Sequence, residues 1–324
     1  MKLLTNFPLY NGCLKEYGDM AGVAAECSKL GLDGIEVIWD HLPYTEELPP
    51  NDLAVGFHMM FWSSWVDFWK GDVEALLREH GDWGTVQECF HCDSREGIIQ
   101  QYKVDLQRAI DLDAEYVVFH VSEVKIDECF TYQFDYSDRE VIDCASELIN
   151  EILDGMDAHM AFLVENQWWS GFKFTDPAMT RRLLDGIEYD NKGIMLDVGH
   201  LLHTNTTLRT QAQAADYILD RYDAHGDLAS FVRGLHLHQS LSGEYVESRG
   251  YQVPDDLVGG YWDKFARCYK HVLQIDKHQP WTDPAVADVV SRIGPEWVNN
   301  ELSAWPREAH SNAIATQLHA LSGK

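Results

Sequence analysis

Short apolar runs of strand type alternate with longer amphipathic stretches along this chain, and many of the runs end in a residue that binds divalent metals. Such alternation is typical of repeated strand–helix–strand units. We expect strands over 2–6, 33–39, 52–60, 114–121, 161–166, 193–198, 231–238 and 297–303. Eight parallel strands with intervening helices are the number that a closed barrel requires, so the sequence predicts an α/β fold of the (β/α)8 TIM-barrel type.

The segments between the strands show helical spacing, caps and breakers. We expect helices near 18–30, 67–80, 95–111, 136–156, 207–222, 284–292 and 306–320, and one that begins at Asp176 and Pro177. Two stretches, near 81–95 and 242–275, depart from the alternation and are expected to be irregular insertions beside the mouth of the barrel. Because no linker or repeat divides the chain, residues 1–324 are predicted to form a single domain.

The net charge is −28, from 25 Lys and Arg against 53 Asp and Glu. Such a surface repels polyanions, so nucleic acid is disfavoured as a partner and a small-molecule carbohydrate is favoured. Seven scattered cysteines, with no membrane-length apolar stretch and no signal-peptide pattern, predict reduced thiols in a cytoplasmic protein without a membrane partner. A homo-oligomer is compatible with this composition.

Residues that bind divalent metals stand at or just after the predicted strand ends. They are His58, His120, Glu165, Asp197, His200, His236, Asp276, His278 and Glu301. In a TIM barrel the C-terminal strand ends point into one mouth, where active sites are built. We therefore expect residues that are far apart in the chain to meet in one centre.

Four of these residues are carboxylates, and few Lys or Arg stand at the strand ends to neutralise them. Buried like charges cost several kcal/mol each unless something compensates them, and bound cations would do so. Oxygen and imidazole ligands suit Mn²⁺, Co²⁺, Mg²⁺ or Zn²⁺. One ion is expected at Glu165, Asp197, His236 and Glu301, and all nine residues are enough for up to three.

Aromatic residues cluster near two of the strand ends. From this cluster, Trp62 and Trp168 are expected to wall a substrate pocket, because flat apolar faces suit the C–H surface of a sugar and exclude water. Ordinary helical packing explains the spacing of Trp62, Trp65 and Trp69 equally well.

Several of these segments resemble the xylose isomerase-like barrel superfamily, in the branch that unites endonuclease IV with sugar isomerases, epimerases and dehydratases. The matching segments are GLDGIEVIW, VVFHVS, VENQWW, MLDVGHLLHTN, RGLHLHQS, IDKHQP and WVNNELSAW, which span nearly the whole barrel. Asp197-Val-Gly-His200 matches the D-x-x-H element of the family, and Asp276-Lys-His278 matches its D-R-H element with Lys in place of Arg.

The resemblance implies one divalent ion at the four positions Glu165, Asp197, His236 and Glu301. It also implies that Glu165 and Glu301 flank the substrate as base and acid. The other D-x-x-H and D-R-H residues would bind substrate hydroxyls or a second ion. His238, on the same strand face as His236, is an alternative ligand, and Glu36 is expected beside the substrate pocket as a supporting group.

We therefore expect a divalent-metal-dependent sugar, keto-sugar or polyol isomerase or epimerase that works through an enediolate. A dehydratase or lyase of a related polyol is one alternative. Another is an endonuclease IV-like zinc phosphodiesterase acting on abasic DNA, because all nine positions of that enzyme's three-metal site have a counterpart here. A barrel that binds a sugar without turnover is a third, which the pair Glu165 and Glu301 disfavours.

Overall fold

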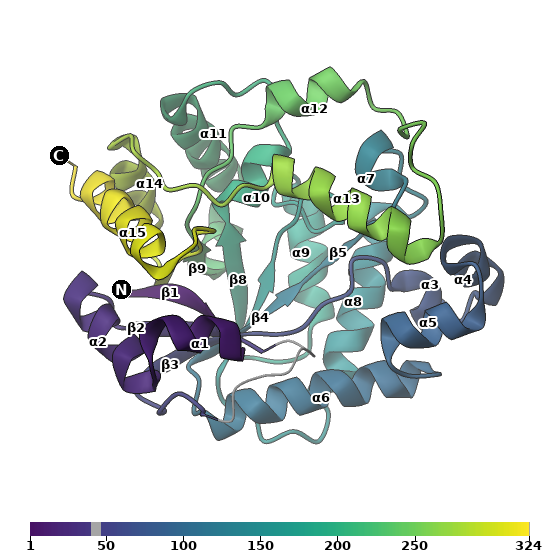
Figure 1. Cartoon of the computed structure of the whole chain (residues 1–324), viewed down its shortest axis with the longest axis horizontal. Coiled ribbons are helices and arrows are strands. Elements are labelled where there is room, and N and C mark those ends of the chain that lie inside the picture. Colours follow the sequence, from purple (N-terminus) through teal and green to yellow (C-terminus); the bar gives the residue numbers. More distant parts are fainter. Residues whose placement is uncertain (40–46, 324) are drawn as a thin grey trace.

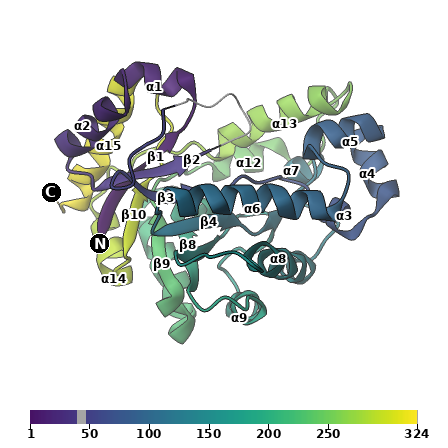
Figure 2. The ribbon, with the colours of Figure 1, turned by 90° about the horizontal axis from the view of Figure 1, so that it is seen from below.

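The computed structural model describes residues 1–39 and 47–323, and eight of its strands form one closed, all-parallel barrel. Around the barrel they follow the order β1-β10-β9-β8-β6-β4-β3-β2. Their bounds are β1 Lys2–Pro8, β2 Gly34–Ile38, β3 Ala54–His58, β4 Tyr116–His120, β6 Ala161–Glu165, β8 Lys192–Asp197, β9 Val232–His236 and β10 Trp297–Asn300. The predicted TIM barrel is confirmed (Figures 1 and 2).

Helices surround the barrel, as the crossover connections of parallel strands require (Figure 2). Those up to the sixth barrel strand are α1 Asn11–Tyr17, α2 Met20–Leu30, α3 Val66–Lys70, α4 Val73–His80, α5 Trp83–Phe90, α6 Arg95–Asp111, α7 Glu128–Thr131, α8 Asp138–Leu153 and α9 Pro177–Gly186. The later ones are α10 Val198–His203, α11 Gln211–Ala224, the 3₁₀ helix η1 Gly226–Phe231, α12 Gly243–Arg249, α13 Tyr261–Ile275, α14 Ala285–Ile293 and α15 Arg307–Leu321. A small antiparallel pair, β5 Ser122–Glu123 and β7 Ser170–Gly171, lies outside the barrel sheet. None of the helices in the described ranges is long and apolar enough to cross a membrane.

The two stretches that were expected to be irregular are helical, so that expectation was wrong. Asp82 caps α5 by accepting a hydrogen bond from the backbone N–H of Thr85. The stretch 242–275 forms α12 and α13, and α13 buries Tyr261, Cys268 and Ile275 in an apolar cluster of its own. The expected helix 67–80 is also two helices, because the chain turns at Gly71 with φ of 70°.

The interior of the barrel is apolar along most of the strands and polar at their C-terminal ends. Its apolar residues are Leu4, Val55, Tyr116, Val118, Ala161, Leu163, Met195 and Trp297. Side chains alternate along a strand, so after Ala161 and Leu163 the next inward residue of β6 is Glu165. In the same way, Asp197 follows Met195 on β8. Apolar side chains therefore fill the barrel below its mouth, and the strands end at the mouth in metal-binding residues.

Candidate metal centre

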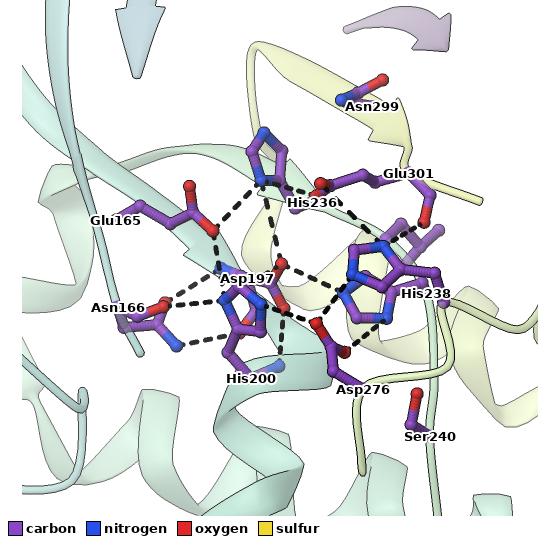
Figure 3. A network of polar contacts seen from close by, with 12 residues as sticks. Glu165, Asn166, Asp197, His200, His236, His238, Ser240, Asp276, Asn299 and Glu301 are labelled. Carbon is purple, nitrogen blue, oxygen red and sulfur yellow. Dashed lines mark hydrogen bonds and ion pairs between the residues drawn. The ribbon is translucent and has the colours of Figure 1, made fainter. Parts of the chain in front are cut away.

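The predicted strand-end residues converge at the C-terminal mouth of the barrel. Figure 3 shows six of them: Glu165, Asp197, His200, His236, Asp276 and Glu301. A first group surrounds Nδ1 of His236, which lies 2.9 Å from Oε2 of Glu301, 3.4 Å from Oε1 of Glu165 and 3.8 Å from Oδ2 of Asp197. Ligand atoms that share an ion at about 2.0–2.2 Å lie roughly 3–4 Å apart, so this spacing suits one cation. His236, Glu165 and Asp197 are fully buried, whereas the side chain of Glu301 is 12% exposed and borders the mouth.

Glu36, expected as a supporting group beside the pocket, lies directly behind His236 and supports that ring. Its Oε2 is 3.0 Å from Nε2 of His236 and accepts a hydrogen bond from the hydroxyl of Tyr116 at 2.7 Å, while its Oε1 accepts one from the amide of Asn299 at 2.9 Å. Gly56 makes room for the Tyr116 ring, since a Cβ there would lie 2.2 Å from it. A carboxylate on the far nitrogen of a histidine fixes its tautomer and turns its other nitrogen toward a metal.

A second group combines His58 and His120 with the other oxygen of Glu165. The two Nε2 atoms are 3.1 Å apart and lie 3.4 Å and 3.0 Å from Oε2 of Glu165. Glu165 thus presents Oε1 to the first group and Oε2 to the second. A carboxylate placed in this way would be able to serve as a ligand in both groups.

A third group is built around Oδ2 of Asp276, which lies 3.3 Å from Nε2 of His200 and 2.7 Å from Nε2 of His278. His238 also borders this group, and its ring stacks on that of His278 at 3.9 Å. Nε2 of His238 is 3.0 Å from Oδ2 of Asp197, a carboxylate of the first group. His236 and His238, which the sequence offered as alternative ligands, therefore both lie at the centre. His236 belongs to the first group, and His238 borders the third.

The histidines are held so that one nitrogen of each is free to face the centre. In three of them Nδ1 lies beside a backbone carbonyl: His58 with Met59 at 2.9 Å, His200 with Asn166 at 3.0 Å and His278 with Glu301 at 3.0 Å. A ring that donates its Nδ1–H to a carbonyl leaves Nε2 with a lone pair for a metal.

Several polar atoms at the centre are buried and make no hydrogen bond of acceptable geometry. They are both Oε atoms of Glu165, Oε2 of Glu301 and the Nδ1 atoms of His236 and His238. Buried polar atoms normally have a hydrogen-bond partner, so several atoms without one in the same place indicate a missing partner. These atoms are of the kinds that bind metals, and they are spaced like the ligands of one ion, so the residues fit a bound cation.

The charges at the centre support the same interpretation. Every ion-pair partner of Glu36, Glu165, Asp197, Asp276 and Glu301 in residues 1–39 and 47–323 is a histidine. Burial opposes charge on the rings of His236 and His278, but neighbouring carboxylates outweigh it: the pKa of His236 is raised well above its usual value through Glu36, Glu301 and Glu165, and that of His278 is raised to about 10 through Asp276. Protons on the imidazoles thus balance charge that divalent cations would otherwise balance.

The aromatic residues named from the sequence fall in different places. Trp62 packs on Phe90 and Tyr102, with ring centroids 5.8 and 5.5 Å apart, and its indole N–H donates to the carbonyl of Cys89. This position corrects the prediction that it walls the pocket. The neighbouring residue, Phe61, instead covers His120 at 4.2 Å and is 51% exposed. Trp168 does border the centre, with its ring 5.2 Å from that of His200.

Two residues outside the nine also organise the centre, and sequence reasoning missed the first of them. The side-chain amide of Asn166 donates to the carbonyl of Asp197 and accepts from its N–H, both at 2.9 Å, which joins β6 to β8. His203, one turn after His200 and favoured by the sequence as a surface or supporting group rather than a ligand, lies 3.2 Å from Oδ1 of Asp276. Asn166 directly follows a predicted ligand, so its place in the chain was a usable signal; His203 had only its helical spacing from His200.

Comparison with known proteins agrees with this fold and centre. Residues 24–244 match the family model described as xylose isomerase-like TIM barrel, which is more than half of the chain. No curated protein matches the sequence.

Solved structures similar to the whole chain include an endonuclease IV from Thermus thermophilus, at 16% identity and a TM-score of 0.51, with both chains covered completely. The IOLI protein with a binding zinc atom is 13% identical, with a TM-score of 0.52 over 99% of this chain and 96% of that one. An L-ribulose 3-epimerase is 10% identical, with a TM-score of 0.52 over 98% and 94%. Identities this low support the fold alone, and the family match carries the assignment. The chain belongs to the xylose isomerase-like TIM barrel family.

Proposed function

We propose that this protein is a divalent-metal-dependent isomerase or epimerase of a small sugar, keto-sugar or polyol. One observation carries the proposal: two carboxylates from different strands, Glu165 and Glu301, approach the same nitrogen of His236 and keep unpaired oxygens. Binding a ligand does not need two bases at one point, whereas moving a proton on and off carbon does.

A cation held by Glu165, Asp197, His236 and Glu301 would stabilise negative charge that develops on a substrate oxygen when the neighbouring C–H loses its proton. The chain's own groups would move that proton. Glu301, at the exposed edge of the group, would take it from carbon, and Glu165 would flank the substrate as its partner in the exchange. Glu36 and the carbonyls behind the histidines would hold the rings in place during turnover.

A small substrate suits the surroundings of the centre better than a polymer does. The chain carries a net charge of −28, and the ligating groups lie deep in the barrel. Helix α13 runs from α4, where Tyr261 stacks on His80 at 4.4 Å, to Asp276 at the mouth, and thus flanks the entrance (Figure 1). A duplex would need both access and positive charge there.

The experiment is solvent exchange in D₂O with a panel of ketoses and keto-sugars, using protein loaded with Mn²⁺ or Co²⁺. We expect deuterium at the carbon next to the carbonyl of any substrate that is turned over, and loss of both exchange and turnover in Glu301→Gln. A variant that keeps its metal and full exchange would refute the acid–base assignment.

One observation favours a second candidate, hydrolysis of a phosphodiester by an endonuclease IV-like centre. All nine predicted residues gather into three groups, the first two joined by Glu165 and the third joined to the first by the contact of His238 with Asp197, which is more than one ion requires. Several ions at one site can activate water and stabilise a leaving oxygen. Three bound Zn²⁺ ions per chain together with cleavage of an abasic duplex would establish this candidate and displace the isomerase.

A further inference from the structure

Both oxygens of Asp276 face imidazoles, and they face different ones. Oδ2 faces His200 and His278, the pair that completes the third group. Oδ1 lies 3.2 Å from Nε2 of His203. His238 is also near Oδ1, but its Nδ1 is 3.9 Å away, which is too long for a hydrogen bond. Of these contacts, the one with His203 is therefore the hydrogen bond that holds Oδ1.

His203 is itself held in one orientation. It ends helix α10, is 6% exposed, and meets the ring of Trp168 edge-on at 4.7 Å. Its Nδ1 lies 3.4 Å from the hydroxyl of Ser242, which is 3% exposed and precedes α12. With the Ser242 hydroxyl donating to Nδ1, the proton of the ring is on Nε2 and is donated to Asp276. Ser242 is thus connected to Asp276 through His203.

The hydrogen bond from His203 limits how Asp276 can bind a cation. A free carboxylate can bind a cation through both oxygens, whereas one that accepts a hydrogen bond on Oδ1 offers only Oδ2. The third group would then supply one oxygen of Asp276 beside His200 and His278, with His238 bordering it as a further candidate ligand. A carboxylate that binds through one oxygen takes up one position around a cation instead of two.

We propose that His203 is a positioning residue that holds Oδ1 of Asp276 and so keeps Asp276 a one-oxygen ligand in the third group. The proposal rests on the metal centre of the proposed function but not on any particular substrate. His203 is not one of the nine strand-end residues.

The test is titration of metal-free protein with Co²⁺ alone, followed by calorimetry and by the visible absorption of the bound ions. In His203→Leu we expect one class of Co²⁺ ion to bind about 10–100-fold more weakly, because partners that orient a ligand have effects of this size. Its absorption should also change, since Asp276 is free to bind through both oxygens. His203→Gln keeps an N–H donor and should recover most of the affinity and the spectrum.

A matched control is His225→Leu. His225 is also a buried histidine, held by Thr180 and the carbonyl of Arg221 far from the metal-binding groups, so its loss should lower stability without changing Co²⁺ binding. If His203→Leu does not fold, Ser242→Ala tests the same contact and should weaken the same class of ion several-fold.

Either of two results with the variants would overturn the proposal: unchanged affinity and spectrum in the His203 and Ser242 variants, or equal weakening of every bound ion. Wild-type protein that binds no ion through Asp276 would also overturn it. None of these results depends on turnover, so the isomerase proposal stands or falls separately on the D₂O experiment.

Discussion

Two regions of the molecule bury a glutamate, and they do so in opposite ways. Between α2 and α15, Glu26 accepts hydrogen bonds from Arg307, from the Ser311 hydroxyl at 2.9 Å and from Lys29 at 2.9 Å. At the mouth of the barrel, Glu165 has four histidines within ion-pair distance but no hydrogen bond of acceptable geometry. Both carboxylates are almost inaccessible to solvent.

The difference separates a group that serves the fold from one that serves a ligand. Glu26 has partners of opposite charge within the chain, so its burial joins a helix early in the sequence to the last one. Glu165 has only histidines within ion-pair distance, and neither of its oxygens accepts a hydrogen bond of acceptable geometry, which is a costly way to bury a carboxylate. A protein that keeps such a group keeps it for something that binds there.

The largest effect is expected at the edge of the centre. Glu301→Gln removes a general acid or base and should lower kcat about 10²–10⁴-fold, the usual contribution of such a group, while the fold stays intact. Steady-state kinetics on any substrate found by deuterium exchange would measure it. Glu26→Gln is the paired control and should leave kcat unchanged; equal losses in both variants would erase the distinction between the two regions.

A smaller effect is expected behind the ligands. Glu36→Gln keeps a hydrogen-bond acceptor near His236 but removes the charge, so metal affinity should fall about 10–100-fold. Calorimetric titration with Mn²⁺ or Co²⁺ would show it. Unaltered affinity would mean that Glu36 only fills space beneath the centre.

The smallest effect is expected at Glu26 and concerns stability. Its pKa is lowered to about 2, chiefly by the hydrogen bond from Arg307, with burial acting against this and Lys29 and Ser311 assisting. A lowered pKa means that the folded state favours the ionised form, so this stabilisation is present above the unfolded value near 4.5 and is lost as the pH falls toward 2.

Glu26→Gln should therefore lower the free energy of unfolding by about 1 kcal/mol at pH 7, since its cationic partners are partly exposed, and by less at pH 3. Urea unfolding at the two pH values measures both numbers. A loss that is the same at both would show that charge at Glu26 is not what stabilises this contact.

The sequence predicted the barrel well because short continuous apolar runs and helix caps are local signals. Strand ends such as AFLVE and GIMLD also placed Glu165 and Asp197 correctly at the mouth. What could not be predicted depends on contacts across the barrel: the sequence did not show that Glu36 supports His236 in particular, or that His203 at the end of α10 meets Asp276 at the end of α13.

The errors have equally physical causes. Trp62 and Phe61 are adjacent, so strand-end position alone cannot tell which ring turns to the centre and which packs under α5 and α6. The stretch 242–275 looked irregular because its glycines and acidic residues lie around α12 and α13, whose inward faces are spaced apolar residues.

The central claim is that Glu165 is unpaired because it binds a cation. The most direct test is thermal unfolding of metal-free wild-type protein and of Glu165→Gln, each titrated with Mn²⁺, Co²⁺ and Zn²⁺. We expect at least one ion per wild-type chain and a stabilisation of about 2.7 kcal/mol at a hundredfold excess over Kd, with little or none in Glu165→Gln. Equal stabilisation of both proteins, or none of the wild type, would contradict the account.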